Sequence, residues 1–365
     1  MDAALAERLF KAYRKGLLLR PPGLWESRAR PFDVLFRQLF WLKVPVLERV
    51  PVAKIWRLGF QGVRLSRESR LEEACAVFRE GWAELERVEL SPQGLLLAIT
   101  FLESAHAYLD YKQGSFDRAR DRVLRSMEAD LQLEADADFN LLELHRIQSA
   151  QNLMRIDLKA GEPRRALDLA GRILAYTEGF LTSLPVHHSW QSEKILVRTP
   201  RPIRRALIGQ VANDVALAFV SLHSADLESE FLAHSAVAWY FEEAGVLHEQ
   251  LRLWFLARQA FHREHWDRYL ELLLDFLPAG RGDIQTIWYS TMIDLLAVCR
   301  SLDSQAALGL HDRILLDVPK WSGVPRPLQA LLGLAEVETR AQPHLQAAGF
   351  GAPASPPETS SRPGV

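Results

Sequence analysis

The chain has 365 residues, of which 48% are hydrophobic and 25% are charged, and its formal net charge is −2. This composition is typical of a folded globular chain, and the small net charge argues against a nucleic-acid-binding surface over the whole chain. The two cysteines, Cys75 and Cys299, are too few for a disulfide framework or a zinc knuckle. We therefore expect a reducing, cytoplasmic location.

Basic residues gather at the beginning of the chain. Residues 1–70 hold 15 Lys and Arg against 6 Asp and Glu, a net charge of +9, which leaves −11 for the remainder. This asymmetry fits an arm that meets an acidic partner, and equally a basic end that packs on the chain's own acidic body. Charges from Asp2 to Lys15 interrupt any signal-peptide core. The longest apolar runs are shorter than the ~20 residues that span a bilayer, so we expect no transmembrane segment.

Residues 24–60 interleave apolar and basic side chains around three tryptophans. Such a composition fits an element that makes peripheral contact with a membrane or a partner, and it also fits a cap on a helical repeat domain. We predict the cap, a basic and Trp/Pro-rich helical segment over residues 1–65, in which Pro45 and Pro51 break the helices.

Apolar residues recur at three- and four-residue steps through most of the chain, and convincing strand-like alternation is absent. The sequence therefore predicts an all-α protein. The predicted helices cover 2–19, 31–43, 66–89, 92–112, 115–133, 136–160, 162–180, 201–222, 225–244, 247–262, 265–277, 282–300, 304–316 and 326–340. A tail rich in Pro, Ala, Ser and Gly, residues 341–365, is predicted to be disordered.

One short frame recurs between the predicted helices. A glycine followed five positions later by an alanine marks 114–119 and 161–166, residues 69–74 fit the same frame, and 264–269 and 301–306 fit it more loosely. The first residue is expected to take a positive φ at a helix end, and the alanine lets two helices approach closely. Repeats of this length predict stacked helical hairpins.

At these residues the sequence resembles the tetratricopeptide-repeat superfamily. That family's repeat has a glycine at the end of one helix, an aromatic residue two positions later and an alanine early in the next helix. Gly114, Phe116 and Ala119 match all three positions, whereas Pro163 replaces the aromatic residue in the following repeat. The resemblance implies an α-solenoid of antiparallel helical hairpins, with irregular repeats over 66–340 wound into a right-handed superhelix.

The same resemblance implies a peptide groove lined by the first helix of each hairpin. Asn152 falls at the groove position, Arg155 lies one turn further on, and Asn213 falls at the corresponding place one unit later. A groove asparagine can donate to and accept from the backbone of an extended peptide. The basic residues of a carboxylate clamp are missing, because Ala105 and Phe255 stand at the matching positions.

An insertion of about twenty residues, 183–205, interrupts the repeats, and long connections of this kind are often functional. It ends in four arginines, Arg198, Arg201, Arg204 and Arg205. Close to a helix N-terminus these side chains favour a carboxylate or a phosphate. The alternative is a solvated loop whose arginines pair with the acidic body of the chain.

Chemistry-bearing motifs are scarce. The histidine-containing pairs are His187 with His188, His262 with His265, and His311 with Asp312, and each lacks a third metal ligand at workable spacing. Nucleophile, phosphate-loop and metalloprotease motifs are absent from the sequence. We therefore expect no metal and no cofactor, and predict a non-catalytic scaffold or adaptor for a protein or peptide partner, with an acidic partner as one option. A sensor module for a small ligand or peptide, and an enzyme with a non-local all-α active site, remain as alternatives.

Overall fold

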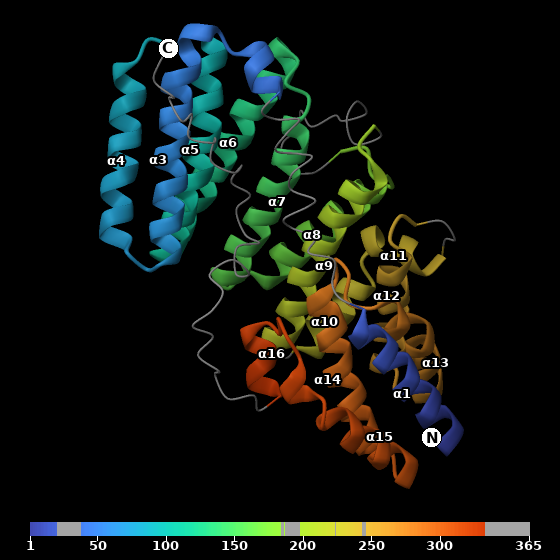
Figure 1. Ribbon diagram of the computed structural model, residues 1–365. Helices are drawn as coiled ribbons and strands as arrows, with labels where there is room; N and C mark the ends of the chain where they lie inside the picture. The colour runs from blue at the N-terminus through green and yellow to red at the C-terminus, as the bar shows by residue number, and fades with distance from the viewer. Residues whose placement is uncertain (20–37, 184–185, 187–197, 223, 243–245, 333–365) are drawn as a thin grey trace, which may run out of the picture. The chain divides into compact units, whose positions relative to one another are not determined.

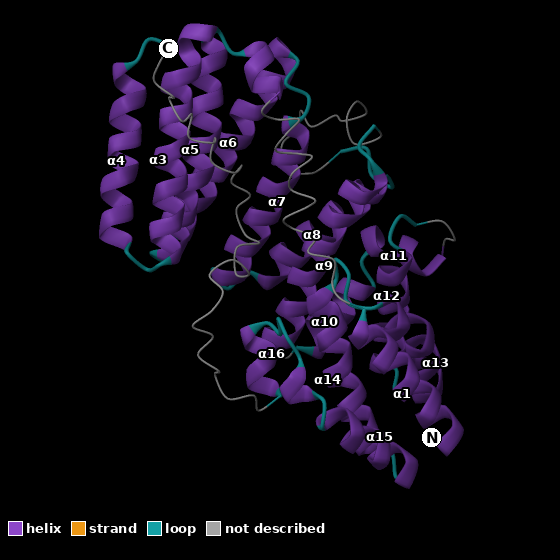
Figure 2. Cartoon of the chain, viewed as in Figure 1, coloured by secondary structure: helices purple, strands orange, loops and turns teal. Residues whose placement is uncertain are grey.

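The computed structural model of the chain describes residues 1–19, 38–183, 186, 198–222, 224–242 and 246–332. Regular secondary structure in these residues is helical, and no strand occurs among them (Figure 2). The prediction of an all-α protein is confirmed.

The helices fall into two compact units, and each is described by itself. The hairpin unit comprises the described residues of Trp25–Ser149, and the discontinuous unit comprises those of Met1–Leu24 and Ala150–Ala348 (Figure 1). The division between the units falls within α7 (Leu142–Lys159).

The hairpin unit is built from long helices joined by short turns. Its remaining elements are η1 (Val46–Glu48), α3 (Arg49–Arg67), α4 (Leu71–Arg87), α5 (Pro92–Lys112) and α6 (Phe116–Ala137). The helix α3 packs against both α4 and α5, and α5 packs against α6 (Figure 1). Two hairpins, α3–α4 and α5–α6, are therefore joined through their first helices.

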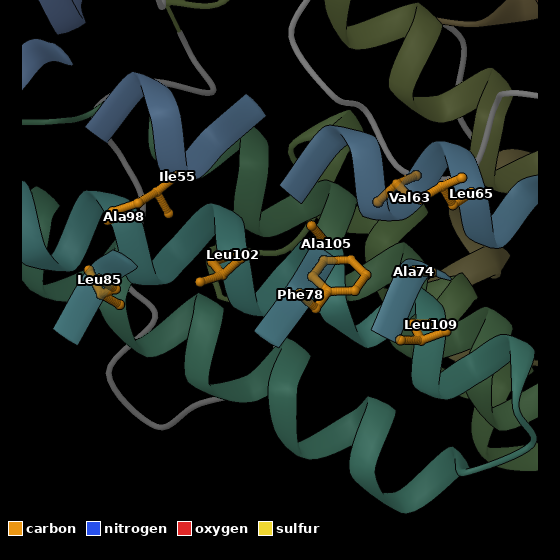
Figure 3. Close-up of a cluster of buried hydrophobic side chains, with 10 residues drawn as sticks. All are labelled: Ile55, Val63, Leu65, Ala74, Phe78, Leu85, Ala98, Leu102, Ala105 and Leu109. Atoms are coloured by element: carbon orange, nitrogen blue, oxygen red, sulfur yellow. The ribbon is translucent and has the colours of Figure 1, made fainter. Parts of the chain in front are cut away.

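Apolar side chains fill the space between α3, α4 and α5 (Figure 3). The ring of Phe78 lies so close to Gly62 that a Cβ on this glycine would come within 2.5 Å of the ring. The hydroxyl of Ser66 donates to the Gly62 carbonyl at 2.8 Å, so the polar group in this buried seam is paired. Close helix packing here depends on the absence of a side chain at position 62.

The discontinuous unit combines the first helix of the chain with the last ones. Its elements are α1 (Ala3–Leu18), α8 (Pro163–Glu178), α9 (Arg201–Leu222), α10 (Ala225–Leu232), α11 (Ser235–Glu242), α12 (Glu249–His262), α13 (Trp266–Phe276), η2 (Leu277–Ala279), α14 (Gln285–Ser301), α15 (Gln305–Leu315), η3 (Val318–Lys320) and α16 (Arg326–Leu331). Spatial order does not follow sequence order in this unit, because α14 packs against α9, and α1 packs against α13 and α15.

Aromatic contacts and an ion pair fix α1 to the end of this unit. The rings of Tyr13 and Trp288 stack at 6.0 Å between centroids, and the indole N–H of Trp321 donates to the Tyr13 hydroxyl at 3.0 Å. Arg14 pairs with Asp317 at 2.8 Å. The start of the chain is therefore grouped differently from the expected cap over 1–65, since α1 packs with residues about 300 positions away.

Four turns between consecutive helices share one backbone geometry. Ser69, Gly114, Gly161 and Glu264 have φ values of 62°, 76°, 84° and 54°. The amide after each of these residues donates to a carbonyl five positions earlier, which is the Schellman closure of a helix end. These bonds join Arg70 to Leu65, Ser115 to Asp110, Glu162 to Asp157 and His265 to Ala260, at 2.9 to 3.0 Å. The left-handed turns predicted by the repeated frame are confirmed at these four positions. At 301–306 the frame lacks a left-handed residue, because α14 ends in an extended Leu302.

At two of these turns a buried aspartate pairs with a more exposed arginine of the next helix. Asp110 accepts from Arg122 at 2.7 Å and lies 3.5 Å from Arg118, while Asp157 accepts from Arg165 at 2.8 and 2.9 Å. Both aspartates are buried four residues before the turn glycine, and Arg118 and Arg165 lie four residues after it. The hairpin signature is thus longer than the glycine–alanine frame that the sequence analysis recognised.

Two helix predictions were wrong, for local reasons. Residues 44–65 were predicted to hold no helix and Pro51 was expected to break one, but α3 covers Arg49–Arg67 and Pro51 lies in its first turn, where the missing N–H has no intrahelical acceptor in any case. The helix expected at 225–244 is split in two. The His234 ring accepts from the Ala236 amide at 3.1 Å and also bonds Asp168 at 2.9 Å, so it caps a new helix, α11.

Glycine-to-alanine substitution should change the free energy of unfolding in opposite directions at a left-handed turn and inside a helix. Replacing Gly161 with Ala adds a Cβ that meets no atom within 4 Å, so its effect is the cost of positive φ, about 1–2 kcal/mol of destabilisation. Gly309→Ala, in the exposed middle of α15 where the Cβ again meets no atom within 4 Å, removes helix-disfavouring glycine and should stabilise by up to about 1 kcal/mol. Urea denaturation of both variants against the parent measures the two shifts, and shifts of the same sign would refute the assignment.

Candidate functional site

The polar residues expected to line a groove are bonded within the discontinuous unit. Asn152 is 2% exposed, and its amide oxygen accepts from Arg155 at 3.4 Å. Arg155 in turn donates to Asp214 of α9 at 2.7 Å, and Gln151 donates to the same carboxylate at 2.6 Å. This network links α7 to α9. The burial of Asn152 disagrees with the groove-facing position that the resemblance implies for it.

Asn213 serves as a helix cap supplied by a neighbouring helix. Its amide nitrogen donates to the Asp283 carbonyl at 2.7 Å, and its amide oxygen accepts from the amides of Thr286 and Ile287 at 3.0 and 3.3 Å. These amides belong to the first turn of α14, which lacks intrahelical acceptors. One turn earlier on α9, a Cβ on Gly209 would come within 2.8 Å of the Asp283 carbonyl. The side chain expected to bind a ligand therefore anchors α14 on α9.

The loop before α14 is also bonded to a fully buried histidine. His248 accepts the Leu251 amide on Nδ1 at 3.2 Å, capping α12, and its Nε2 lies 3.3 Å from the Asp283 carboxylate. Burial acts to raise the pKa of Asp283, but the adjacent His248 ring and, to a smaller extent, the charge of Arg205 outweigh it and lower the pKa to about 2. Asp283 is therefore ionised at neutral pH, and its carboxylate lies beside the His248 ring.

The four arginines at the start of α9 have different fates. Arg204 donates to the Thr177 carbonyl at 2.6 and 2.9 Å and so closes the last turn of α8. Arg198, Arg201 and Arg205 are exposed. None of these three pairs with a carboxylate among the described residues at salt-bridge distance. Most of the expected insertion at 183–205 lies outside the described residues.

No group of three or more metal-ligating side chains suited to a metal ion occurs in the described part of the chain. His262 lies 3.0 Å from Glu228, and Arg258 bridges Glu228 and Asp294, so these groups of α10, α12 and α14 are bonded to one another. His311 is beside Asp312 at 3.0 Å on the surface. His187 and His188 lie outside the described residues.

The helix α9 is the one described helix that is long and apolar enough to cross a membrane, with a mean hydropathy of 1.2. Half of that apolar window is buried within the structure. Its polar side chains Asn213 and Asp214 are bonded to α14 and α7, as described above. The contacts of α9 are those of a core helix.

A hollow that the sequence did not indicate lies among α1, α12 and α13. It has a volume of about 410 Å³, and four leucines are among the residues that line it. Arg8, Arg252 and Arg268 line it together with the carboxylates of Glu271 and Asp275. Arg252 pairs with Glu249 at 3.0 Å, outside the lining set. No local pattern could have revealed the hollow, because α1 joins helices more than 230 residues away in the sequence.

No family model, curated protein or solved structure matches this chain. The resemblance to tetratricopeptide repeats therefore rests on the turn residues alone.

The capping role of Asn213 predicts a stability defect. Asn213→Ala leaves two amides and one carbonyl without their partner and should destabilise the chain by about 1–3 kcal/mol. Asn213→Asp keeps an acceptor for the first turn of α14 and should lose less. Gln132→Ala, an exposed amide bonded to Glu128 on its own helix, serves as the control and should change stability by less than about 0.5 kcal/mol. Thermal and urea denaturation measure all three, and a harmless Asn213→Ala would contradict the cap.

Proposed function

We propose that the protein is a non-catalytic adaptor that holds a protein or peptide partner on a scaffold of irregular, tetratricopeptide-like helical hairpins. The Schellman turns and the α3–α4 and α5–α6 hairpins support the resemblance on which this proposal rests. A right-handed solenoid is the arrangement that the resemblance implies for the consecutive hairpins.

The observation that carries the proposal is the set of exposed arginines at the start of α9. Asn152, Asn213 and Arg204 form hydrogen bonds within the folded protein. Arg198, Arg201 and Arg205 stay at the surface, and none of them forms an ion pair at salt-bridge distance with a carboxylate of the described residues. Guanidinium groups in such a position favour carboxylates, so we assign an acidic segment of the partner to them.

A second candidate is a regulatory module for a small anionic ligand. The hollow among α1, α12 and α13 favours it, because leucines and three arginines line a volume of about 410 Å³, a size that suits a small amphipathic carboxylate. Arg268 pairs with Glu271 at 3.5 Å and Arg252 pairs with Glu249, so such a ligand would compete with these carboxylates. The two candidates differ in the residues that they require, so one experiment separates them.

Charge reversal at the start of α9 tests the adaptor. The variant Arg198→Glu, Arg201→Glu, Arg205→Glu is compared with a matched control, Arg79→Glu, Arg263→Glu, Arg300→Glu, which reverses three other exposed arginines. Parent and variants are used to capture proteins from the native cell, with quantitation by mass spectrometry.

At least one protein should be retained by the parent and the control but reduced about tenfold or more by the α9 variant, because three exposed charge pairs become repulsive. Its retention should also fall as salt is raised. Identical capture by the two triple variants would overturn the assignment. A small acidic molecule that co-purifies with the parent and is lost only on Arg8→Glu with Arg268→Glu would favour the hollow instead.

A further inference from the structure

One end of the hairpin unit has an apolar surface that its own helices leave uncovered. We define the apolar end surface as Trp41, Leu42, Val46, Leu47, Val50 and Leu95, whose exposed fractions run from 40% at Leu95 to 91% at Leu47. Among the described residues of this unit, these are the large hydrophobic side chains that are exposed. Solvent-exposed apolar side chains that gather in one place mark an interaction site more often than scattered ones do.

The local structure explains why these residues lie together. Val46 and Leu47 belong to η1, Val50 belongs to the first turn of α3, and Leu95 belongs to the first turn of α5. The Ser91 hydroxyl donates to Glu48 at 2.8 Å and thereby joins η1 to the start of α5. Both helices begin at the same end of the unit (Figure 1).

Buried residues of the same segment anchor the apolar end surface to the helices of the unit. Phe40 and Val44 alternate with the exposed residues and are buried in a cluster that includes Trp56 and Phe101. Arg49 donates to the Val44 carbonyl at 3.0 Å, and its guanidinium lies over the Trp41 ring at 5.1 Å. One face of this segment therefore anchors it to the helices, and the other face presents large apolar groups to the outside.

Charge extends along α3 from the apolar end surface. Arg49–Arg67 contains five basic residues and no Asp or Glu. Val50, Arg57 and Arg64 recur at seven-residue steps and so share one helix face. Arg57 and Arg64 are exposed and form no ion pair with a carboxylate of the described residues. Along the helix axis Arg57 is about 10 Å and Arg64 about 21 Å from Val50, so Arg57 is the basic residue of this face that lies within reach of an anionic surface met by this end.

Acidic residues at the same end weaken electrostatic attraction to a negative surface relative to apolar burial. Glu48 is occupied by Ser91, whereas Glu86 and Glu89 at the end of α4 and Asp136 and Asp138 at the end of α6 are exposed. These four carboxylates oppose attraction to a negative surface. Burial of the apolar groups must therefore supply most of the affinity, and the basic face of α3 supplies the preference for negative charge.

We propose that the apolar end surface inserts into the interfacial region of a lipid bilayer that contains anionic lipids. The exposed groups stand on the first turns of two helices and on η1, and a bilayer can receive such a set without a complementary shape. Trp41 beside a guanidinium is the pairing of an amphipathic aromatic ring and a cation that suits the headgroup level. A second copy of the chain and a groove on another protein are the competing occupants.

Vesicle co-sedimentation of the full chain tests the proposal. The vesicles are phosphatidylcholine alone, and phosphatidylcholine with one quarter phosphatidylserine. The variant Leu42→Asp, Leu47→Asp places two charges in the apolar end surface. Its matched control is Leu308→Asp, Leu316→Asp, which alters two exposed leucines of the discontinuous unit. A second pair compares Arg57→Glu, Arg64→Glu with Arg263→Glu, Arg300→Glu.

The parent should bind both vesicles and prefer those with phosphatidylserine. Leu42→Asp, Leu47→Asp should weaken binding about tenfold or more, because two side chains lose their apolar burial, while its control should stay within about twofold. Arg57→Glu, Arg64→Glu should abolish the preference for phosphatidylserine. Circular dichroism confirms that each variant is folded.

Three outcomes would overturn the proposal. The first is a parent that binds neither vesicle, and the second is equal binding by the leucine variant and its control. The third is a parent that binds no vesicle but forms a dimer in sedimentation velocity, which dissociates on Leu42→Asp, Leu47→Asp. The last would assign the surface to a second copy. Retention of full vesicle binding by the leucine variant alongside loss of a protein partner would assign it to a protein groove.

Discussion

A single residue in the left-handed region closes each of four helical turns, and the hairpin architecture depends on it. With φ near +50° to +85°, the chain reverses within one residue, and the next amide returns to the carbonyl five positions earlier. The following helix then begins close enough to pack on the one before it. At two of the turns a buried aspartate and an arginine tie the two helices together across the reversal.

The polar residues of the discontinuous unit are used mainly to hold helix ends. Asn213 caps α14, Arg204 closes α8, His248 caps α12 and His234 caps α11. Each bond satisfies backbone groups that a helix end leaves without partners. Because these side chains are already bonded, our two proposals place recognition on groups that remain exposed, namely the arginines at the start of α9 and the apolar end surface.

Local patterns in the sequence predicted local features of the structure well. The helix class and the left-handed turns follow from periodicity and from the frame around Gly114 and Gly161, because both depend on residues a few positions apart. The long-range contacts could not be predicted in this way. The packing of α1 against α13 and α15, and the hollow that it helps to form, join residues far apart in the chain.

The candidate site shows the same limit. Asn152 and Asn213 occupy positions where the resemblance implies a groove, but their surroundings depend on α9 and α14, which no local pattern brings to them. The distinction between Arg204 and its neighbours depends on which guanidinium reaches the Thr177 carbonyl, a matter of helix geometry. Pro51 was misjudged because its effect depends on its place within α3, in the first turn instead of the interior.

Residue-resolved arginine modification tests the central claim most directly, namely that folding consumes one set of polar groups and leaves another for recognition. The native chain is treated with a dicarbonyl reagent, and the rate at each arginine is read by mass spectrometry against the unfolded chain. Arg155 and Arg204 should be strongly protected, while Arg198, Arg201 and Arg205 should react nearly as fast as when unfolded. Equal rates at all five arginines would contradict the account.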